Sequence, residues 1–136
     1  ERLRDLAPEL PWPDHIWMGV TVESANYRYR IDHLREVPAK VRFLSCEPLI
    51  GFIGKMNLNA INWVIAGGES GPLARPMRGE WVDEILRQCR LQDTAFFFKQ
   101  WGGTRKDLTG RLLHGRTFDE MPELPSQKTL ELQLSF

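Results

Sequence analysis

The chain of 136 residues has no long apolar run, few cysteines and no excess charge of either sign. No apolar stretch approaches the roughly 20 residues that a membrane-spanning helix requires, so we expect no membrane segment. The N-terminus lacks the pattern of a secretory signal. The 18 Lys and Arg residues balance 18 Asp and Glu residues. Net charge therefore creates no general attraction to nucleic acid or to an anionic membrane, although a local basic face stays open.

The two cysteines, Cys46 and Cys89, lie far apart and in no metal-ligand spacing. We therefore expect no disulfide framework and no metal site, and we predict a reducing, cytoplasmic setting. Cys89 falls on the apolar stripe of a predicted helix and is expected in the core. Cys46 stands beside Glu47, whose charge would raise the thiol pKa rather than activate the thiol, so Cys46 is also assigned to packing.

Apolar segments alternate with helical patterns along the chain. Strands are predicted at 16–23, 41–49, 61–66 and 95–98, and helices at 25–37 and 80–91. This order predicts an α/β fold built of parallel βαβ units. Four strands are too few for a closed barrel, which takes about 250 residues. The chain is thus either a small open sheet or one half of a larger barrel, and its first residue, Glu1, favours a start inside a longer protein.

Two regions are expected. Residues 1–102 carry the parallel α/β pattern, and residues 103–136 form a loop-rich extension. Residues 129–136 alternate strictly between polar and apolar side chains, as a half-buried strand does. That segment could cover an edge of the sheet or pair with something else.

Each predicted strand ends in polar residues, and this is the main functional signal. The carboxyl ends of parallel strands share one rim, where ligands bind. Three carboxylates and a lysine should meet there: Glu23, Glu47, Glu69 and Lys99. Lys99 could form a structural ion pair with Glu47 or Glu69, and such a pair could equally frame a binding site. Gly67 and Gly68 form a turn whose amides could face an anion.

Four further residues near these strand ends could bind a ligand, but each could also have a purely structural or solvated role. Gln100 and Trp101 could bind a planar ligand by hydrogen bonding and stacking, although Trp101 could simply cap the core. Arg75 and Arg78 could grip a phosphate or carboxylate, or could be solvated loop residues.

Several segments together resemble one family. They are IWMGVTVE with the following YRYRIDHL, VRFLSCEPLIG, INWVIAGGESGPLARPM, FFFKQWGG and GRLLHGRTFDEMP. In this order, over residues 11–122, they resemble the poorly characterised phage gene-product 37/68 family, a radical-SAM-like group of phages and bacteria. The third and fourth segments are specific when taken together.

The resemblance implies the C-terminal four strands of a partial (β/α)₆ radical-SAM-like barrel. An upstream portion would carry three clustered cysteines for a [4Fe–4S] cluster, and S-adenosylmethionine would be the cofactor. By this analogy eight residues face the cofactor: Ser45, Glu47, Gly67, Gly68, Glu69, Ser70, Lys99 and Gln100. Glu23, Arg75 and Trp101 would face substrate. Cys46 and His114 depart from the family pattern, and no catalytic residue is assigned.

Three functions follow as expectations. The chain could be part of an enzyme of unknown substrate, inactive alone because it lacks the cluster cysteines. It could be a non-catalytic module that binds a nucleotide or nucleic acid through basic loop residues, which are Arg75, Arg78, Arg105, Lys106, Arg111 and Arg116. It could also be a phage accessory protein. Expected partners are the missing N-terminal half of the barrel or a second copy, since exposed strand edges tend to pair.

Overall fold

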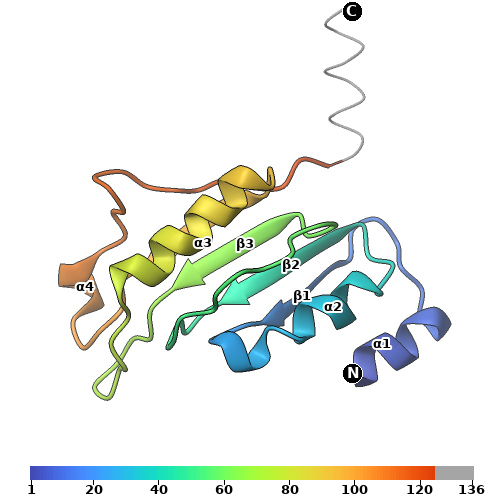
Figure 1. The fold of residues 1–136 in the computed structure, drawn as a ribbon, viewed down its shortest axis with the longest axis horizontal. Helices are drawn as coiled ribbons and strands as arrows, with labels where there is room; N and C mark the ends of the chain where they lie inside the picture. The colour runs from blue at the N-terminus through green and yellow to red at the C-terminus, as the bar shows by residue number, and fades with distance from the viewer. Residues whose placement is uncertain (125–136) are drawn as a thin grey trace, which may run out of the picture.

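A four-stranded, entirely parallel sheet forms the centre of the protein, whose computed structural model describes residues 1–124. The strands are β1 (Trp17–Thr21), β2 (Val41–Cys46), β3 (Trp63–Gly67) and β4 (Ala95–Gln100). They lie side by side in chain order (Figure 1). The α/β fold with a parallel sheet is therefore confirmed, and all four carboxyl ends meet at one rim.

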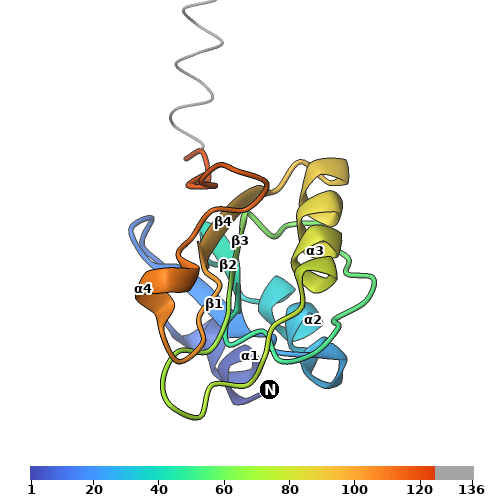
Figure 2. The same ribbon diagram turned by 90° about the vertical axis from the view of Figure 1, so that its left-hand side faces the viewer.

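The helices are mostly short. They are α1 (Arg2–Leu6), α2 (Arg30–Arg35), α3 (Gly79–Leu91) and α4 (Lys106–Thr109), with 3₁₀ turns at Ala7–Glu9 and Ala25–Tyr27. Figure 2 shows α2 and α3 on one side of the sheet and α4 on the other. Among residues 1–124, no helix is both long enough and apolar enough to cross a membrane.

The two faces of the sheet differ in burial. Side chains alternate along each strand, so odd and even positions point to opposite faces. The face under α2 and α3 is buried along β2, β3 and β4, where it includes Leu44, Cys46, Val64, Phe96 and Phe98, and is partly buried along β1. These residues form one continuous core with both helices, which gives the site a rigid base.

The opposite face is aromatic and only partly buried. The Trp63 ring packs edge-on against Trp17 and Phe97, with centroid distances of 6.1 and 6.0 Å, and tilts against Phe43 at 5.9 Å. Gly19 makes room for this row, because a Cβ there would lie 2.4 Å from the Phe43 ring. Parallel sheets are normally covered on both faces, so this face is an unusual feature among residues 1–124.

The connection from β2 to β3 contains no helix and is held by α3 instead. The buried Gln88 accepts the Met56 N–H at 2.6 Å and donates to the Gly54 carbonyl at 2.9 Å. Gln92, one turn later, accepts the Leu58 N–H at 2.8 Å. Gln88 of α3 and Gln92, the residue that follows α3, therefore hold a helix-free connection between two parallel strands.

The helix predicted at 25–37 is shorter than expected. A 3₁₀ turn occupies Ala25–Tyr27, and α2 begins only at Arg30. Ser24 was the expected N-cap, but its hydroxyl makes no capping hydrogen bond, so the α-helix does not begin at residue 25. The strand predicted at 41–49 likewise ends at Cys46. The helix at Gly79–Leu91 and the four strands otherwise lie within a few residues of their predicted positions.

Residues after β4 close one edge of the sheet. The Phe98 N–H donates to the Phe118 carbonyl at 2.8 Å, and Phe97 and Asp119 form an antiparallel bridge. Leu113 and Phe118 are buried in the same core as the strands. The segment predicted as an edge strand, 129–136, lies outside the described residues.

Candidate functional site at the carboxyl rim

The rim brings together side chains from three neighbouring strand ends. Glu47 and Lys99 form an ion pair, with Lys99 Nζ 3.1 Å from Glu47 Oε1. The Glu47 side chain is 21 % exposed and the Lys99 side chain 53 %. Gly67 lies beneath them, since a Cβ there would sit 3.3 Å from Glu47 Cδ and 3.4 Å from Lys99 Cβ. Of the two partners predicted for Lys99, the structure selects Glu47.

Gly68 fixes how closely β3 and β4 approach at their ends. Its N–H donates to the Gln100 carbonyl at 2.9 Å, and a Cβ on Gly68 would lie 1.9 Å from the Trp101 carbonyl oxygen. Gly102, with φ +78°, packs against the Glu69 backbone, where a Cβ would lie 2.2 Å from the carbonyl oxygen. The predicted Gly-Gly turn is therefore required by backbone contact, independently of any ligand.

Glu69 is engaged by Arg75 rather than by Lys99. The Arg75 guanidinium donates two hydrogen bonds, from Nε at 2.8 Å and Nη2 at 2.9 Å, and its backbone N–H donates a third at 2.9 Å. These bonds lower the pKa of Glu69 to about 2. A carboxylate that accepts three donors is committed to its loop and stays ionised at neutral pH.

Glu23 lies at the end of β1 and belongs to the same charged neighbourhood. It is 3.8 Å from Arg30 Nη1, and Arg30 also stacks over the Tyr27 ring at 4.3 Å. The pKa of Arg75 is raised, chiefly by its hydrogen bonds to Glu69 and to a lesser degree by the charges of Glu23 and Tyr27. Tyr27 and Arg30 thus lie beside Glu23 at the rim, although no motif in the sequence marks either of them as a site residue.

The other predicted site residues at the rim contact other parts of the protein. Gln100 Nε2 donates to the Ser70 hydroxyl at 2.7 Å, so these two side chains already satisfy each other. Trp101 packs its ring against Phe98 at a centroid distance of 5.1 Å and donates its indole N–H to the Leu112 carbonyl at 2.7 Å. Ser45 lies on the aromatic face of the sheet, two residues before Glu47, and is paired with Thr21 of β1. Trp101 therefore caps the core, which is the structural alternative to binding a planar ligand.

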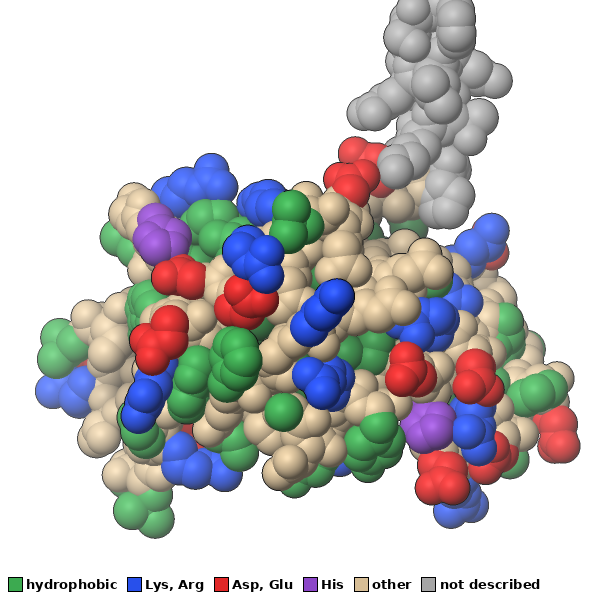
Figure 3. All heavy atoms as spheres, viewed as in Figure 1, with side chains coloured by type: hydrophobic (Ala, Val, Ile, Leu, Met, Phe, Trp, Pro, Cys, Tyr) green, Lys and Arg blue, Asp and Glu red, His purple; other side chains and the backbone are tan. Residues whose placement is uncertain are grey.

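The basic loop residues are mostly paired with acids. Arg78 lies 3.8 Å from Glu80, Arg105 2.9 Å from Asp107, and Arg111 binds Asp119. Arg116 stacks over the Phe118 ring at 4.1 Å. On the face that carries α2 and α3, acidic and basic side chains are likewise interspersed (Figure 3).

The thiols are not available as ligands. Cys46 and Cys89 are buried, as predicted. Burial raises the pKa of the Cys46 thiol and raises that of Cys89 to about 12. Among residues 1–124, no group of three His, Cys, Asp or Glu side chains could hold a metal ion.

Fold and rim together define a parallel α/β domain whose strand ends place a partly buried carboxylate and an exposed ammonium side by side over Gly67. Residues 1–122 match the model of the family described as protein of unknown function (DUF5131), and the chain belongs to that family. Comparisons with curated proteins and with solved structures found no match.

Proposed function

We propose that the chain is the C-terminal part of a radical-SAM-like barrel of phage or bacterial origin, acting in the cytoplasm. In this proposal the carboxyl rim holds the amino-acid end of S-adenosylmethionine. The observation that carries it is the Glu47–Lys99 pair over Gly67, at the rim where parallel sheets bind ligands.

The pair fits an α-amino acid because it offers one charge of each sign to solvent. The Lys99 ammonium is the more exposed partner and would bind the ligand carboxylate. The Glu47 carboxylate would accept from the ligand ammonium. Because Gly67 carries no side chain, Glu47 and Lys99 can close over the β3 backbone and hold their charged groups side by side. Glu69 holds Arg75 in a fixed orientation and so shapes the loop beside the pair.

An iron–sulfur cluster does not fit the described residues. Both cysteines are buried with raised thiol pKa values, and cluster ligands must be thiolates. When bound, such a cluster would supply the electron for reductive cleavage of S-adenosylmethionine, and its ligands would have to come from a preceding segment. We therefore propose that the chain binds the cofactor but does not cleave it alone.

The nucleic-acid alternative has less support. Binding to nucleic acid needs basic groups that can neutralise phosphates and so displace the counterions condensed on the nucleic acid. Four of the basic loop residues already have acidic partners. Affinity for nucleic acid that falls steeply with salt would favour this alternative over the cofactor proposal.

The test is an NMR titration of the ¹⁵N-labelled chain with S-adenosylmethionine. We expect the Gly67, Gly68 and Lys99 amide signals to shift in a saturable way, and Glu47→Gln to weaken binding about tenfold or more. Asp32→Asn, on the exposed side of α2, is the matched control and should bind as the native chain does. Absence of any saturable shift at millimolar ligand would contradict the proposal.

A further inference from the structure

A groove of about 870 Å³ lies on the helix side of the sheet, between α3 and the connection from β2 to β3. Three parts of the chain line it: Arg28 just before α2, residues 55–57 of the connection, and the C-terminal part of α3 with the following Gln92. None of these residues belongs to the carboxyl rim, so the groove is a separate feature of the surface.

The groove combines a buried floor with an exposed leucine. Met56 and Gln88 are 2 % and 3 % exposed, and the Met56 N–H donates to the Gln88 side chain at 2.6 Å. Leu91, the last residue of α3, is 71 % exposed and lies on the same helix face as Arg87 and Gln88. The groove therefore offers an apolar contact on a floor that is already fixed.

Arg28 is held in the groove by neutral groups. Its Nη1 donates to the Ile53 carbonyl at 3.1 Å and to the Lys55 carbonyl at 3.2 Å. Gly54, with φ +79°, leaves the space for it, because a Cβ there would lie 2.9 Å from Arg28 Nη1. Since carbonyl groups carry no net charge, these bonds orient the guanidinium and leave its positive charge uncompensated.

The groove has an excess of positive charge. Its lining includes three basic side chains, Arg28, Lys55 and Arg87, and no acidic one. Arg87 is paired with Glu84 at 2.7 Å, whereas among residues 1–124 neither Arg28 nor Lys55 forms an ion pair. In Figure 3 the middle of this face shows basic side chains without adjacent acidic ones. Two uncompensated cations therefore lie beside the exposed leucine.

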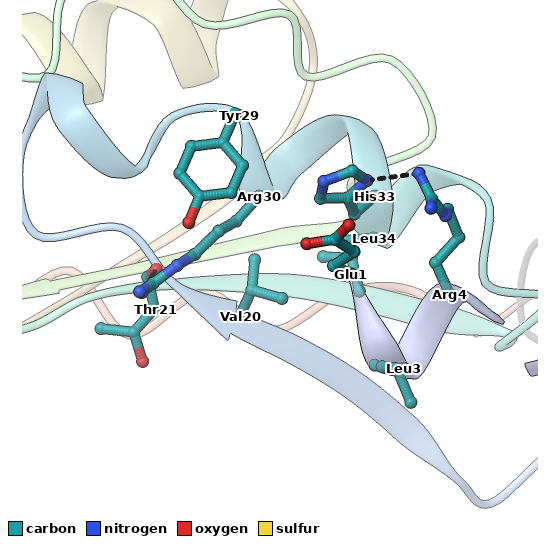
Figure 4. Close-up of a pocket in the computed structure, with 9 residues that line it drawn as sticks. All are labelled: Glu1, Leu3, Arg4, Val20, Thr21, Tyr29, Arg30, His33 and Leu34. Atoms are coloured by element: carbon teal, nitrogen blue, oxygen red, sulfur yellow. Dashed lines mark hydrogen bonds between the residues drawn. The ribbon is translucent and has the colours of Figure 1, made fainter. Parts of the chain in front are cut away.

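A cavity of about 320 Å³ between α1, α2 and β1 provides a contrast (Figure 4). Its two guanidiniums already face acids. Arg4 lies 2.8 Å from Asp5 and 3.9 Å from Glu36, and Arg30 lies 3.8 Å from Glu23. This cavity therefore has no comparable excess charge to attract an anion.

We propose that the groove docks an acidic amphipathic helix of a partner protein. Carboxylates of the helix pair with Arg28 and Lys55, and one of its apolar side chains packs against Leu91. Because these three side chains are exposed, a small molecule here would stay largely in water, whereas a helix covers all of them. Arg28 is oriented in advance, which reduces the entropy lost on binding. The proposal is independent of the proposed cofactor, since the groove shares no residue with the rim.

The test is an NMR titration of the ¹⁵N-labelled full chain with a synthetic helical peptide of Ala, Glu and Leu. The same peptide with Gln in place of Glu is the control probe. We expect the Lys55, Asn57 and Leu91 amide signals to shift in a saturable way, with at least tenfold weaker binding of the Gln peptide. No saturable shift at millimolar acidic peptide would overturn the proposal, as would a DNA oligonucleotide that saturates these signals at lower concentration.

Two matched pairs of variants locate the binding. Lys55→Glu should weaken binding of the acidic peptide at least fivefold, whereas Lys106→Glu makes the same charge change on α4, across the sheet, and should not. Leu91→Gln should also weaken binding, whereas Leu73→Gln, at a side chain that is 93 % exposed, should not. Undiminished binding in Lys55→Glu or in Leu91→Gln would overturn the proposal.

Discussion

Gly68 and Gly19 show how single residues set the spacing of the sheet. Both lie where a neighbouring group occupies the space of a Cβ, the Trp101 carbonyl for Gly68 and the Phe43 ring for Gly19. A ring can rotate or shift. The Trp101 carbonyl instead belongs to backbone that follows β4 and is held by the Trp101 N–H bond to the Gly110 carbonyl and the Gly103 N–H bond to the Glu69 carbonyl, so moving it strains these bonds. A methyl group at Gly68 should therefore reduce the free energy of unfolding more than a methyl group at Gly19.

We predict that Gly68→Ala destabilises the fold by about 3 kcal/mol or more, at the upper end of overpacking costs, because the Trp101 carbonyl must move. Gly79→Ala is the control. Its Cβ would meet only the Trp101 ring at 3.7 Å, and alanine is the better helix former at the start of α3. Urea unfolding followed by circular dichroism measures both. Equal stability of the two variants would contradict the account of this turn.

The Glu69 carboxyl should affect stability only in acid. Its pKa is lowered to about 2 by Arg75, below the ordinary value of 4.5, so its contribution is present above pH 4.5 and is lost as pH falls toward 2. NMR titration of the carboxyl should give a midpoint near 2 in the native chain and a higher one in Arg75→Ala. A midpoint near 4.5 in the native chain would show that the hydrogen bonds to Arg75 do not hold in solution.

For single residues, the sequence predicted which kind of contact a side chain makes better than it predicted which residue is the partner. That Lys99 would pair with a rim carboxylate follows from three carboxylates sharing one edge. The pairing of Glu69 with Arg75 depends on how the loop at 71–78 folds back, which no local pattern encodes. Burial of Cys89 was predicted because it lies on the apolar stripe of a helix, and packing of Cys46 was predicted because the adjacent Glu47 would not activate its thiol.

At the scale of elements, strands and α3 were predictable because their hydrophobic periods are strong. The start of α2 was not, because the Ser24 signal competes with a 3₁₀ turn at Ala25–Tyr27. The pairing of residues 118–120 with β4 was not predictable either. It depends on contacts between residues far apart in the sequence, such as the hydrogen bond from the Trp63 indole to the Glu120 carbonyl, and no local hydrophobic pattern predicts such contacts.

Glu120 holds that closing segment, and its loss should open it. Its carboxylate accepts the Phe96 N–H at 2.9 Å and binds the Arg90 guanidinium through both oxygens, at 2.8 and 2.6 Å. We predict that Glu120→Ala costs about 1–3 kcal/mol, since the Phe96 N–H loses its acceptor. Glu80→Ala, which removes only an exposed pair at 3.8 Å, should cost much less. Chemical denaturation compares them, and equal losses would contradict the role of Glu120.

Gln88 is predicted to order the connection between β2 and β3. Gln88→Ala removes the acceptor of the Met56 N–H and the donor to the Gly54 carbonyl, so hydrogen exchange at Met56 should accelerate by tenfold or more. The neighbouring Arg87→Ala removes an exposed pair with Glu84 and should leave that exchange rate nearly unchanged. Unchanged protection of Met56 in Gln88→Ala would mean that the loop is held by other contacts.

For the whole molecule, the sheet is open in two respects among residues 1–124. One face carries partly exposed aromatic rings, and the β1 edge has no partner strand. Sequence pattern predicted the parallel fold and an exposed strand edge, and the strand order shows that among residues 1–124 this edge belongs to β1. In the proposed barrel, a preceding strand would pair with this edge.

The most direct test of the central claim exchanges the charges of the rim pair. Glu47→Lys combined with Lys99→Glu keeps an ion pair at the same place, so the thermal midpoint should stay close to that of the native chain. If the pair holds the amino-acid end of S-adenosylmethionine, calorimetric titration should show binding to the native chain and at least tenfold weaker binding to the exchanged variant. Equal affinity in both chains would contradict the account and leave the pair a purely structural one.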